Sequence, residues 1–226
     1  MASRTAKPRT AATKPARRRR RYHHGNLSAA LIDASLQLLE EGGPEKVIVR
    51  QAAKRAGVSS GAPFRHFPNR TALMAAVAEE ALRRFQAEIA SALGGVPADD
   101  PIARIRALGF AFLRWAIRNP THFQVISTRS LFDYEDSQSL RRENEQIIAL
   151  TEELVVEAQR RGLLRPAETR LIVIAGRALV YGLARMYTDG QFPRWGMAEA
   201  EAEQIANAAF DLWIAGIAED RGDRQR

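Results

Sequence analysis

Cysteine is absent from all 226 residues, which removes several classes of function at once. Disulfide bonds, thiolate metal sites and a cysteine nucleophile are excluded, and a reducing compartment is compatible with this composition. Membrane-length apolar runs are also missing, because the most apolar run, residues 171–176, is far shorter than the ~20 residues that a membrane span needs. No apolar segment typical of a secretory signal follows the basic N-terminus. The sequence therefore predicts a cytoplasmic protein without a membrane partner.

Residues and motifs that carry catalysis are scarce. Histidine occurs four times, at His23, His24, His66 and His122, and the sequence contains no HExxH motif, phosphate-binding loop or nucleophile elbow. We therefore expect no catalytic residues, no metal and no cofactor. An all-α enzyme remains the least favoured alternative.

Acidic residues are missing from two stretches of the chain. Residues 1–21 carry nine basic groups and no acid, which leaves a net charge of −1 for the rest of a chain whose total is +8. Residues 46–70 carry six basic groups and no acid: Lys46, Arg50, Lys54, Arg55, Arg65 and Arg70. Clustered positive charge of this kind is typical of phosphate contact. The alternative is a solvated basic face without a partner.

Strand-forming runs are nearly absent, since VIVR at 47–50 is the only β-branched run. Apolar periodicity, Gly and Pro breaks and polar cap residues instead predict an all-α fold. The helices are expected at about 26–41, 49–56, 59–67, 69–93, 102–118, 121–131, 138–162, 167–189 and 198–219. The expected domains are a disordered basic arm at 1–21, a helix-turn-helix unit at 22–69 and a larger ligand-sensing and dimerisation domain at 70–226.

The segment 49–67 has the plan of a helix-turn-helix, in which two short helices are joined by a turn that contains Gly57. Ser59 or Ser60 is expected to cap the second helix, and Pro63 is tolerable near its first turn. The second helix of such a motif lies in the DNA major groove. An ordinary helical hairpin with a basic surface is the alternative.

The stretch AAKRAGVSSGAPFRHFPNRTALMAAV resembles the tetracycline-repressor-type (TetR) family of transcriptional regulators, and RYHHGNL before the first helix strengthens the likeness. The resemblance implies a homodimeric regulator, of which a repressor is the usual form, that binds a palindromic DNA operator at the bacterial nucleoid. It also implies a divergent C-terminal domain that binds a small hydrophobic or acidic effector. By resemblance, Arg50 opens the second helix, Arg65 and His66 contact phosphates, and Arg70 lies near the DNA backbone. The resemblance also implies that the DNA groove is faced by Ser59, Ser60, Gly61, Ala62 and Phe64.

Three positions depart from the family pattern. Ile48 stands where Thr is usual, Phe64 where Tyr is common, and Pro63 where Leu is common. The C-terminal stretch GRALVYGLARMYTDGQF more weakly resembles a branch of the family with a Trp-His-Gly pattern, whose Trp and His are replaced here by Arg177 and Tyr181.

The last two predicted helices and the aromatic residues of the C-terminal domain suggest a dimer interface and a ligand pocket. Small residues on the first of these helices, Ala178 and Gly182, permit close approach, and the second offers a matching surface with Ala209, Trp213 and Gly216, so both helices are expected to pack across a two-fold axis. A pocket is predicted from Phe112, Trp115, Phe123, Arg177, Tyr181 and Tyr187. The alternatives are packing within one subunit and an aromatic core. For the whole protein, the remaining alternative is an architectural DNA binder without sequence preference.

Overall fold

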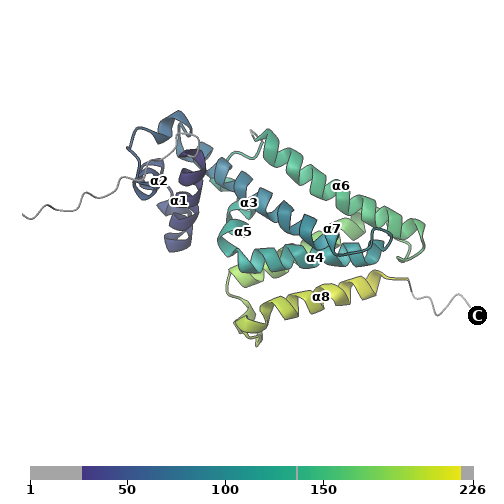
Figure 1. Ribbon diagram of the computed structural model, residues 1–226. Coiled ribbons are helices and arrows are strands. Elements are labelled where there is room, and N and C mark those ends of the chain that lie inside the picture. Colours follow the sequence, from purple (N-terminus) through teal and green to yellow (C-terminus); the bar gives the residue numbers. More distant parts are fainter. Residues whose placement is uncertain (1–26, 136, 220–226) are drawn as a thin grey trace, which may run out of the picture.

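The computed structural model describes residues 27–135 and 137–219, which form eight α-helices (Figure 1). The helices are α1 (Leu27–Gly42), α2 (Val49–Ala56), α3 (Arg70–Gly94), α4 (Pro101–Arg118), α5 (Pro120–Ser127), α6 (Gln138–Arg160), α7 (Thr169–Thr188) and α8 (Ala202–Ile217). Within the described ranges there is no strand, only one isolated bridge between Leu164 and Ala218. The predicted all-α fold is therefore confirmed. The arm predicted at 1–21 lies outside the described residues.

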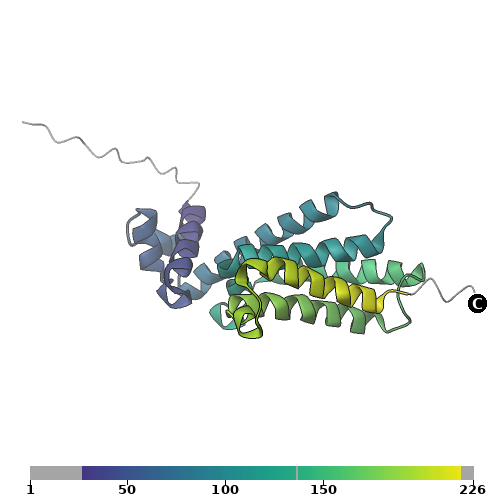
Figure 2. The same cartoon turned by 90° about the horizontal axis from the view of Figure 1, so that it is seen from below.

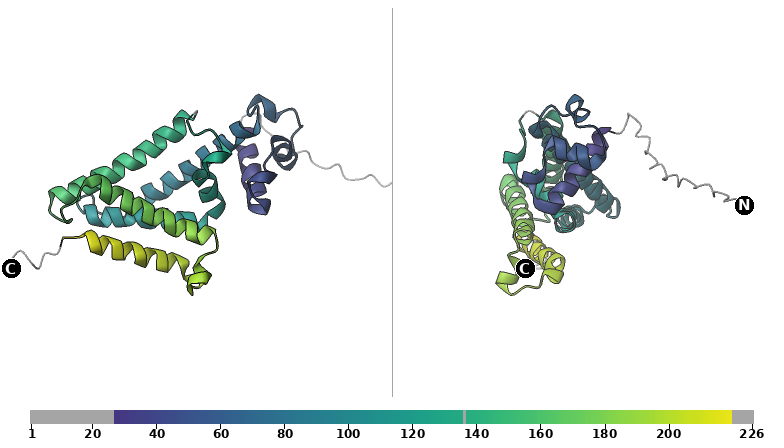
Figure 3. Two further views of the ribbon diagram at one scale, coloured as in Figure 1. Left: turned by 180° about the vertical axis from the view of Figure 1, so that it is seen from behind. Right: turned by 90° about the vertical axis from the view of Figure 1, so that its left-hand side faces the viewer.

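The molecule has a small N-terminal head and a larger helical body (Figure 1). The head contains α1 and α2, and α3 runs from it into the body. Within the body α4 is central, since it contacts α3, α6, α7 and α8. Helices α7 and α8 contact each other and lie together on one side of the body, away from the head (Figures 2 and 3).

Side-chain caps and glycines set several helix ends where the sequence predicts them. The Asn69 Oδ1 accepts a hydrogen bond from the backbone N–H of Ala72 at 2.8 Å at the start of α3, and Asp100 caps α4 in the same way. Gly57 ends α2 in the left-handed region, with φ 71°, which suits a residue without a Cβ atom. The turn after α2 is therefore fixed by local sequence.

The predicted third helix at 59–67 is wrong as a continuous helix. The structure has only a single 3-10 turn there, Pro63–Arg65, and no side chain caps it. Pro63 has no N–H to donate to the carbonyl of Ser59, which instead accepts a hydrogen bond from the N–H of Ala62 at 3.1 Å. The segment is instead held by hydrogen bonds from the N–H groups of His66 and Phe67 to the carbonyl of Pro63, at 2.9 and 2.8 Å.

Two further predicted helices are shorter than expected. Helix α5 ends at Ser127, where Thr128 leaves the helical region, and a 3-10 turn at Arg129–Leu131 follows. Helix α8 begins at Ala202 after a separate 3-10 turn at Glu199–Glu201. Two more such turns occur at Pro44–Lys46 and Phe192–Trp195.

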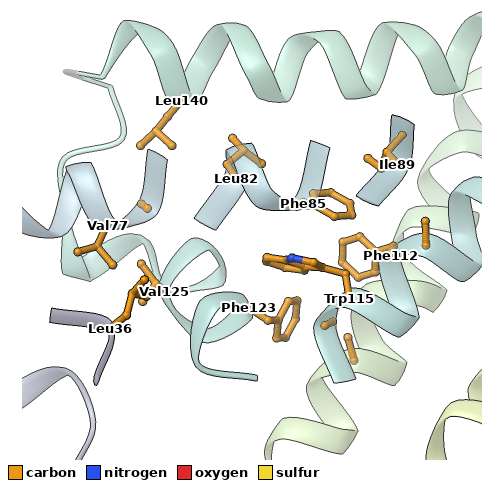
Figure 4. Close-up of a cluster of buried hydrophobic side chains, with 14 of the residues drawn as sticks. Leu36, Val77, Leu82, Phe85, Ile89, Phe112, Trp115, Phe123, Val125 and Leu140 are labelled. Carbon is orange, nitrogen blue, oxygen red and sulfur yellow. The ribbon is translucent and has the colours of Figure 1, made fainter. Parts of the chain in front are cut away.

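One apolar core extends from the head into the body (Figure 4). Leu36 of α1, Val77 of α3 and Val125 of α5 are buried together where head and body meet. Deeper in the body, the Phe85 ring centroid lies 5.4 Å from that of Phe112 and 4.9 Å from that of Trp115. Aromatic pairs at these distances stabilise a core beyond their buried area. The head is thus attached to the body by packing as well as by the chain.

Helix α7 is, by length and apolarity, long enough to cross a membrane, the one such helix in the described residues. It also carries arginines at 170, 177 and 185, and it packs against α4, α6 and α8. Its exposed side is apolar, with Leu171 and Ile174 each about 60% exposed. These contacts are those of a bundle helix with one uncovered face.

Candidate nucleic-acid interface and ligand cavity

The outer surface of the head carries most of the residues predicted to touch DNA. Ala62 is half-buried, and the exposed residues are Arg50, Ser59, Ser60, Gly61, Phe64, Arg65 and His66. Beneath them Pro63 and Phe67 are buried and fix the turn to the core of the head. Phe64 is 43% exposed, which leaves a large apolar ring on the surface beside Arg65. The structure therefore places the residues from Ser59 to His66 on one exposed turn rather than a helix, while Arg50 lies on α2.

Arg70 differs from its basic neighbours because it is tied into the head. Its Nε donates to the carbonyl of Val47 and its Nη2 to the carbonyl of Pro44, both at 2.9 Å. The side chain is half-buried and joins the first turn of α3 to the segment before α2. We find a structural role here that sequence reasoning missed. A phosphate contact by Arg70 would have to use its remaining N–H donors.

The positive charge at 46–70 is partly neutralised by a residue outside that stretch. Arg55 forms a two-pronged ion pair with Glu41 of α1, with both N–O distances 2.5 Å. The hydrogen bonds from Arg55 hold the pKa of Glu41 below its ordinary value. Within the described residues Arg50, Lys54 and Arg65 have no such partner. These three are the basic groups of the head that remain available to an anionic ligand.

A polar network joins the head to the body through Arg84 of α3. Its guanidinium donates to Glu80 at 2.6 Å and to Asp33 of α1 at 3.4 Å, and its Nη1 lies 3.2 Å from Nε2 of the buried His122 of α5. Arginine has no acceptor, so Nε2 of His122 must be unprotonated and Nδ1 must carry the proton. Burial, and secondly the charge of Arg84, lower the pKa of His122. A neutral His122 thus connects α5 to both α3 and α1.

The body contains a large cavity of about 470 Å³, open to solvent on one side. A volume of this size falls within the 300–1,000 Å³ typical of small-molecule sites. Its walls come from five helices and are mostly apolar; they include Ile105, Leu108, Phe112, Val155, Val180, Phe210 and Trp213, with Asn144, Thr151, Glu152, Arg170 and Arg177 as polar members. A smaller cavity of about 60 Å³ lies beside it, against α5.

Five residues line both cavities: Phe85, Phe112, Asn144, Ile147 and Arg177. The Arg177 guanidinium carbon lies 4.9 Å from the centre of the Phe112 ring and 6.0 Å from that of Tyr181, distances at which a cation interacts with an aromatic face. Arg177 is reached by solvent, yet it is surrounded closely enough for burial to lower the pKa of its guanidinium. The boundary between the two cavities therefore carries a positive charge in a largely apolar setting.

The predicted pocket residues divide into two groups. Phe112 and Arg177 line both cavities, while Phe123 and Tyr181 line the small one. Trp115 is buried between Phe85 and His122 and lines neither cavity. Tyr187 packs against Phe192, beyond the end of α7, and is also outside both. Sequence reasoning missed the wall from α6, where Asn144, Thr151 and Glu152 interrupt an apolar stripe at helical spacing.

Helices α7 and α8 share an uncovered apolar face. Leu171 and Ile174 on α7 are exposed, and Leu212 on α8 is 76% exposed. The predicted interface residues Ala178 and Gly216 are also exposed, and Gly182 and Ala209 are half-buried. Trp213 instead turns inward, where it stacks on Phe210 at 5.2 Å and covers Gly176 of its own chain. The structure thus supplies a seam of small residues flanked by leucine and isoleucine, without Trp213.

Two family models match this chain. The model described as "Bacterial regulatory proteins, tetR family" matches residues 31–77, which are the head and the start of α3. The model described as "Tetracyclin repressor-like, C-terminal domain" matches residues 105–212, which form most of the body. The chain belongs to the tetR family. The Trp-His-Gly branch suggested by the C-terminal stretch stays unconfirmed for this tetR-family chain.

Curated relatives match part of this tetR-family chain. An uncharacterized HTH-type transcriptional regulator of Mycobacterium tuberculosis is 41% identical over 73 residues, and the HTH-type transcriptional regulator BetI of Yersinia pestis is 32% identical over 78 residues. These matches span about a third of this chain and 37% and 39% of the relatives. The chain therefore spans well under half the length of these curated relatives.

Solved structures match over most of the tetR-family chain. A protein of unknown function from a Rhodococcus species has a TM-score of 0.74 at 27% identity and covers 89% of this chain and 100% of its own. The TetR family transcriptional regulator PfmR from Thermus thermophilus has a TM-score of 0.65 at 21% identity and covers 82% and 97%. The second likeness concerns the fold alone. Head and body are therefore arranged as in other members of the family.

Proposed function

We propose that this protein is a DNA-binding transcriptional regulator, acting as a repressor, whose operator binding is changed by a small-molecule effector. The observation that carries the proposal is the combination of two features in one tetR-family chain. The head exposes Arg50, Lys54 and Arg65 without internal partners, beside small residues that allow close approach to DNA. The body holds a cavity of about 470 Å³, which is a suitable size for an effector.

The small cavity beside the effector cavity is connected to the head by α5. The wall of the small cavity includes Phe123, Ile126 and Ser127 of α5, and His122, next to Phe123, contacts Arg84, which also reaches Asp33 in α1. A ligand that changes the position of α5 would thereby change the position of the head. The ligand can change DNA affinity only as far as it binds one arrangement of α5 and the head more tightly than the other. The coupling free energy between two such sites is typically ~1–3 kcal/mol.

A homodimer that binds a palindromic operator completes the proposal. Two copies that join their α7–α8 faces would form a four-helix bundle across a two-fold axis and bury Leu171, Ile174 and Leu212. A symmetric dimer presents two heads to two half-sites of opposite orientation. A cytoplasmic location at the nucleoid accords with this function.

The test is a selection of fragments from genomic DNA by the purified full-length protein. We expect enrichment of a small set of fragments that share a palindromic site. Enrichment without any shared site would contradict the proposal and favour an architectural DNA binder.

A further inference from the structure

The positive charge of Arg177 has no counter-ion in its own chain. Among the described residues no hydrogen bond or ion pair satisfies its guanidinium, and its neighbours are the rings of Phe112 and Tyr181. Tyr181 opposes the lowering of the pKa of Arg177, and no carboxylate contributes. Solvent reaches Arg177, so its charge is hydrated while the cavities are empty, and its N–H groups are free to donate to an anion or a strong acceptor that enters.

Arg177 is not the only polar group at this point without a partner. Asn144 of α6 faces the same boundary between the cavities and also has no hydrogen-bond partner among the described residues. The hydroxyl of Tyr181 lies 3.5 Å from the carbonyl of Ser127, at the upper limit of a hydrogen bond, and is therefore weakly engaged. Three groups that can donate hydrogen bonds thus converge on the small cavity from α6 and α7.

Both cavities are lined mainly by apolar side chains, and they differ in size and in the share of polar groups. The small cavity, at about 60 Å³, exceeds the ~10–15 Å³ that one water molecule needs, and Ser127, Asn144, Arg177 and Tyr181 supply polar groups, so it suits a carboxylate. The large cavity is lined mainly by aliphatic and aromatic side chains and suits an apolar body.

We propose that the effector is an apolar organic acid whose carboxylate is bound by Arg177, with Asn144 and Tyr181 as further donors, and whose apolar body fills the large cavity. The ligand class rests on the proposed function, since it concerns the same effector site. A guanidinium binds a carboxylate through two parallel N–H···O bonds, so Arg177 selects acids over alcohols of the same shape. The bound carboxylate touches the wall formed by α5, the helix that reaches the head.

The experiment uses dodecanoate and 2-naphthoate, a linear and an aromatic acid, with 1-dodecanol and 2-naphthol as their uncharged counterparts. Binding to the full-length protein is measured by calorimetry at submicellar concentration. The variants are Arg177→Gln, Arg177→Lys and, as a matched control, Arg185→Gln, which lies about two turns away on α7 and lines neither cavity. Circular dichroism establishes that each variant is folded.

We expect at least one acid to bind the wild type and Arg185→Gln equally, and to bind Arg177→Gln at least ~10-fold more weakly, the loss expected for hydrogen bonds to a charged group. Arg177→Lys keeps the charge and should retain part of the affinity. The alcohols should bind more weakly than the acids and be insensitive to Arg177→Gln. The proposal is overturned if neither acid binds, if Arg177→Gln binds the acid as the wild type does, or if the alcohols bind as tightly as the acids.

Operator binding of ligand-free wild type and Arg177→Gln is measured in parallel. Equal, site-specific DNA binding by both proteins together with a failed acid titration would reject the ligand class and leave the proposed function standing. Absence of site-specific DNA binding by the wild type would reject the proposed function, whatever the outcome of the acid titration.

Discussion

Arg65 and Arg70 come from the same basic stretch, but their surroundings give them different tasks. Arg65 is exposed and has no internal partner, so its charge is available to a phosphate. Arg70 donates to two backbone carbonyls and stabilises the junction between α3 and the segment before α2. Replacing Arg65 should therefore weaken DNA binding, whereas replacing Arg70 should lower the stability of the fold.

Replacing Arg65 by Ala should weaken DNA binding across all sequences while the preferred site is kept. One lost phosphate contact lowers the slope of log K against log salt by ~1. Fluorescence anisotropy at several salt concentrations measures this slope. Arg160→Ala, an exposed arginine on α6 far from the head, is the control and should bind as the wild type does. A lost sequence preference with an unchanged slope would instead show that Arg65 reads a base.

His122 makes stability depend on pH, since its pKa in the folded protein is lowered from an ordinary value of 6.5. As the pH falls, His122 is therefore protonated at a higher pH in the unfolded chain than in the folded protein. The stabilising effect of neutral His122 is fully present above pH 6.5 and is progressively lost below it, until the lower folded pKa is passed. Arg84 lowers this pKa further, whereas Glu40 and Glu80 oppose the effect.

Because glutamine does not titrate, the free energy of unfolding of His122→Gln should lack the pH dependence that His122 contributes. Urea unfolding between about pH 5 and pH 8 measures it, with the exposed His66→Gln as control. If the free energy of unfolding changes with pH in the same way for the wild type and His122→Gln, His122 is not the group responsible. A changed pH dependence for His66→Gln would show that the effect is not specific to His122.

At the scale of elements, the contact between α7 and α8 depends on Gly176. A Cβ atom added at Gly176 would lie 2.7 Å from the Trp213 ring, too close for a real contact. Gly176→Ala should therefore lower the free energy of unfolding by ~1–2 kcal/mol, since overpacking costs ~1–3 kcal/mol and the better helix propensity of Ala returns part of it. Denaturant unfolding measures the change.

The control for Gly176→Ala is Gly94→Ala, where an added Cβ would meet nothing within 4 Å. This variant should be as stable as the wild type or slightly more so. An equal loss at both positions would show that the Trp213 contact is not the cause. Because Trp213 also lines the large cavity, Gly176→Ala should change the shape of that cavity as well.

The helices themselves were predictable wherever a local signal defined both ends. Asn69 acts as the N-cap of α3, and Gly57 ends α2, as the sequence indicates. The second helix of the predicted motif is replaced by a 3-10 turn at Pro63–Arg65, in a segment where Pro63 has no N–H to donate.

The cavity was harder to predict because its walls depend on how each helix is rotated about its axis. Phe112 and Trp115 are three residues apart on α4 and both are aromatic, yet Phe112 lines the cavities while Trp115 is buried against Phe85 and His122. Residue type and spacing do not determine the rotation of α4 about its axis, because that rotation is set by packing against neighbouring helices. In the same way, the rotation of α8 about its own axis turns Trp213 inward and leaves Leu212 exposed.

For the whole molecule, the α7–α8 face predicts the oligomeric state. Leu212→Glu places a charge at the centre of the proposed interface and should convert a dimer into a monomer. Light scattering coupled to size-exclusion chromatography measures the mass in solution. Val156→Glu is the control, because Val156 of α6 is similarly apolar and 51% exposed but lies outside that face. A wild type that is already a monomer, or a Leu212→Glu variant that stays a dimer, would contradict the proposed interface.

The unbroken course of α3 from the head into the body has a mechanical consequence (Figure 1). Its 25 residues at about 1.5 Å each give a rod of about 37 Å. A tilt of only ~5° about its inner end displaces the outer end of such a rod by about 3 Å, and two such rods in a symmetric pair move in opposite directions. Half-sites on DNA have a fixed repeat of about 34 Å, so a doubled displacement of this size changes the fit of both heads together. Phe85 lies about 14 Å from the inner end of α3, so the same tilt moves Phe85 by about 1 Å while the outer end moves roughly three times as far. A small adjustment beside the cavities is thus amplified by geometry alone.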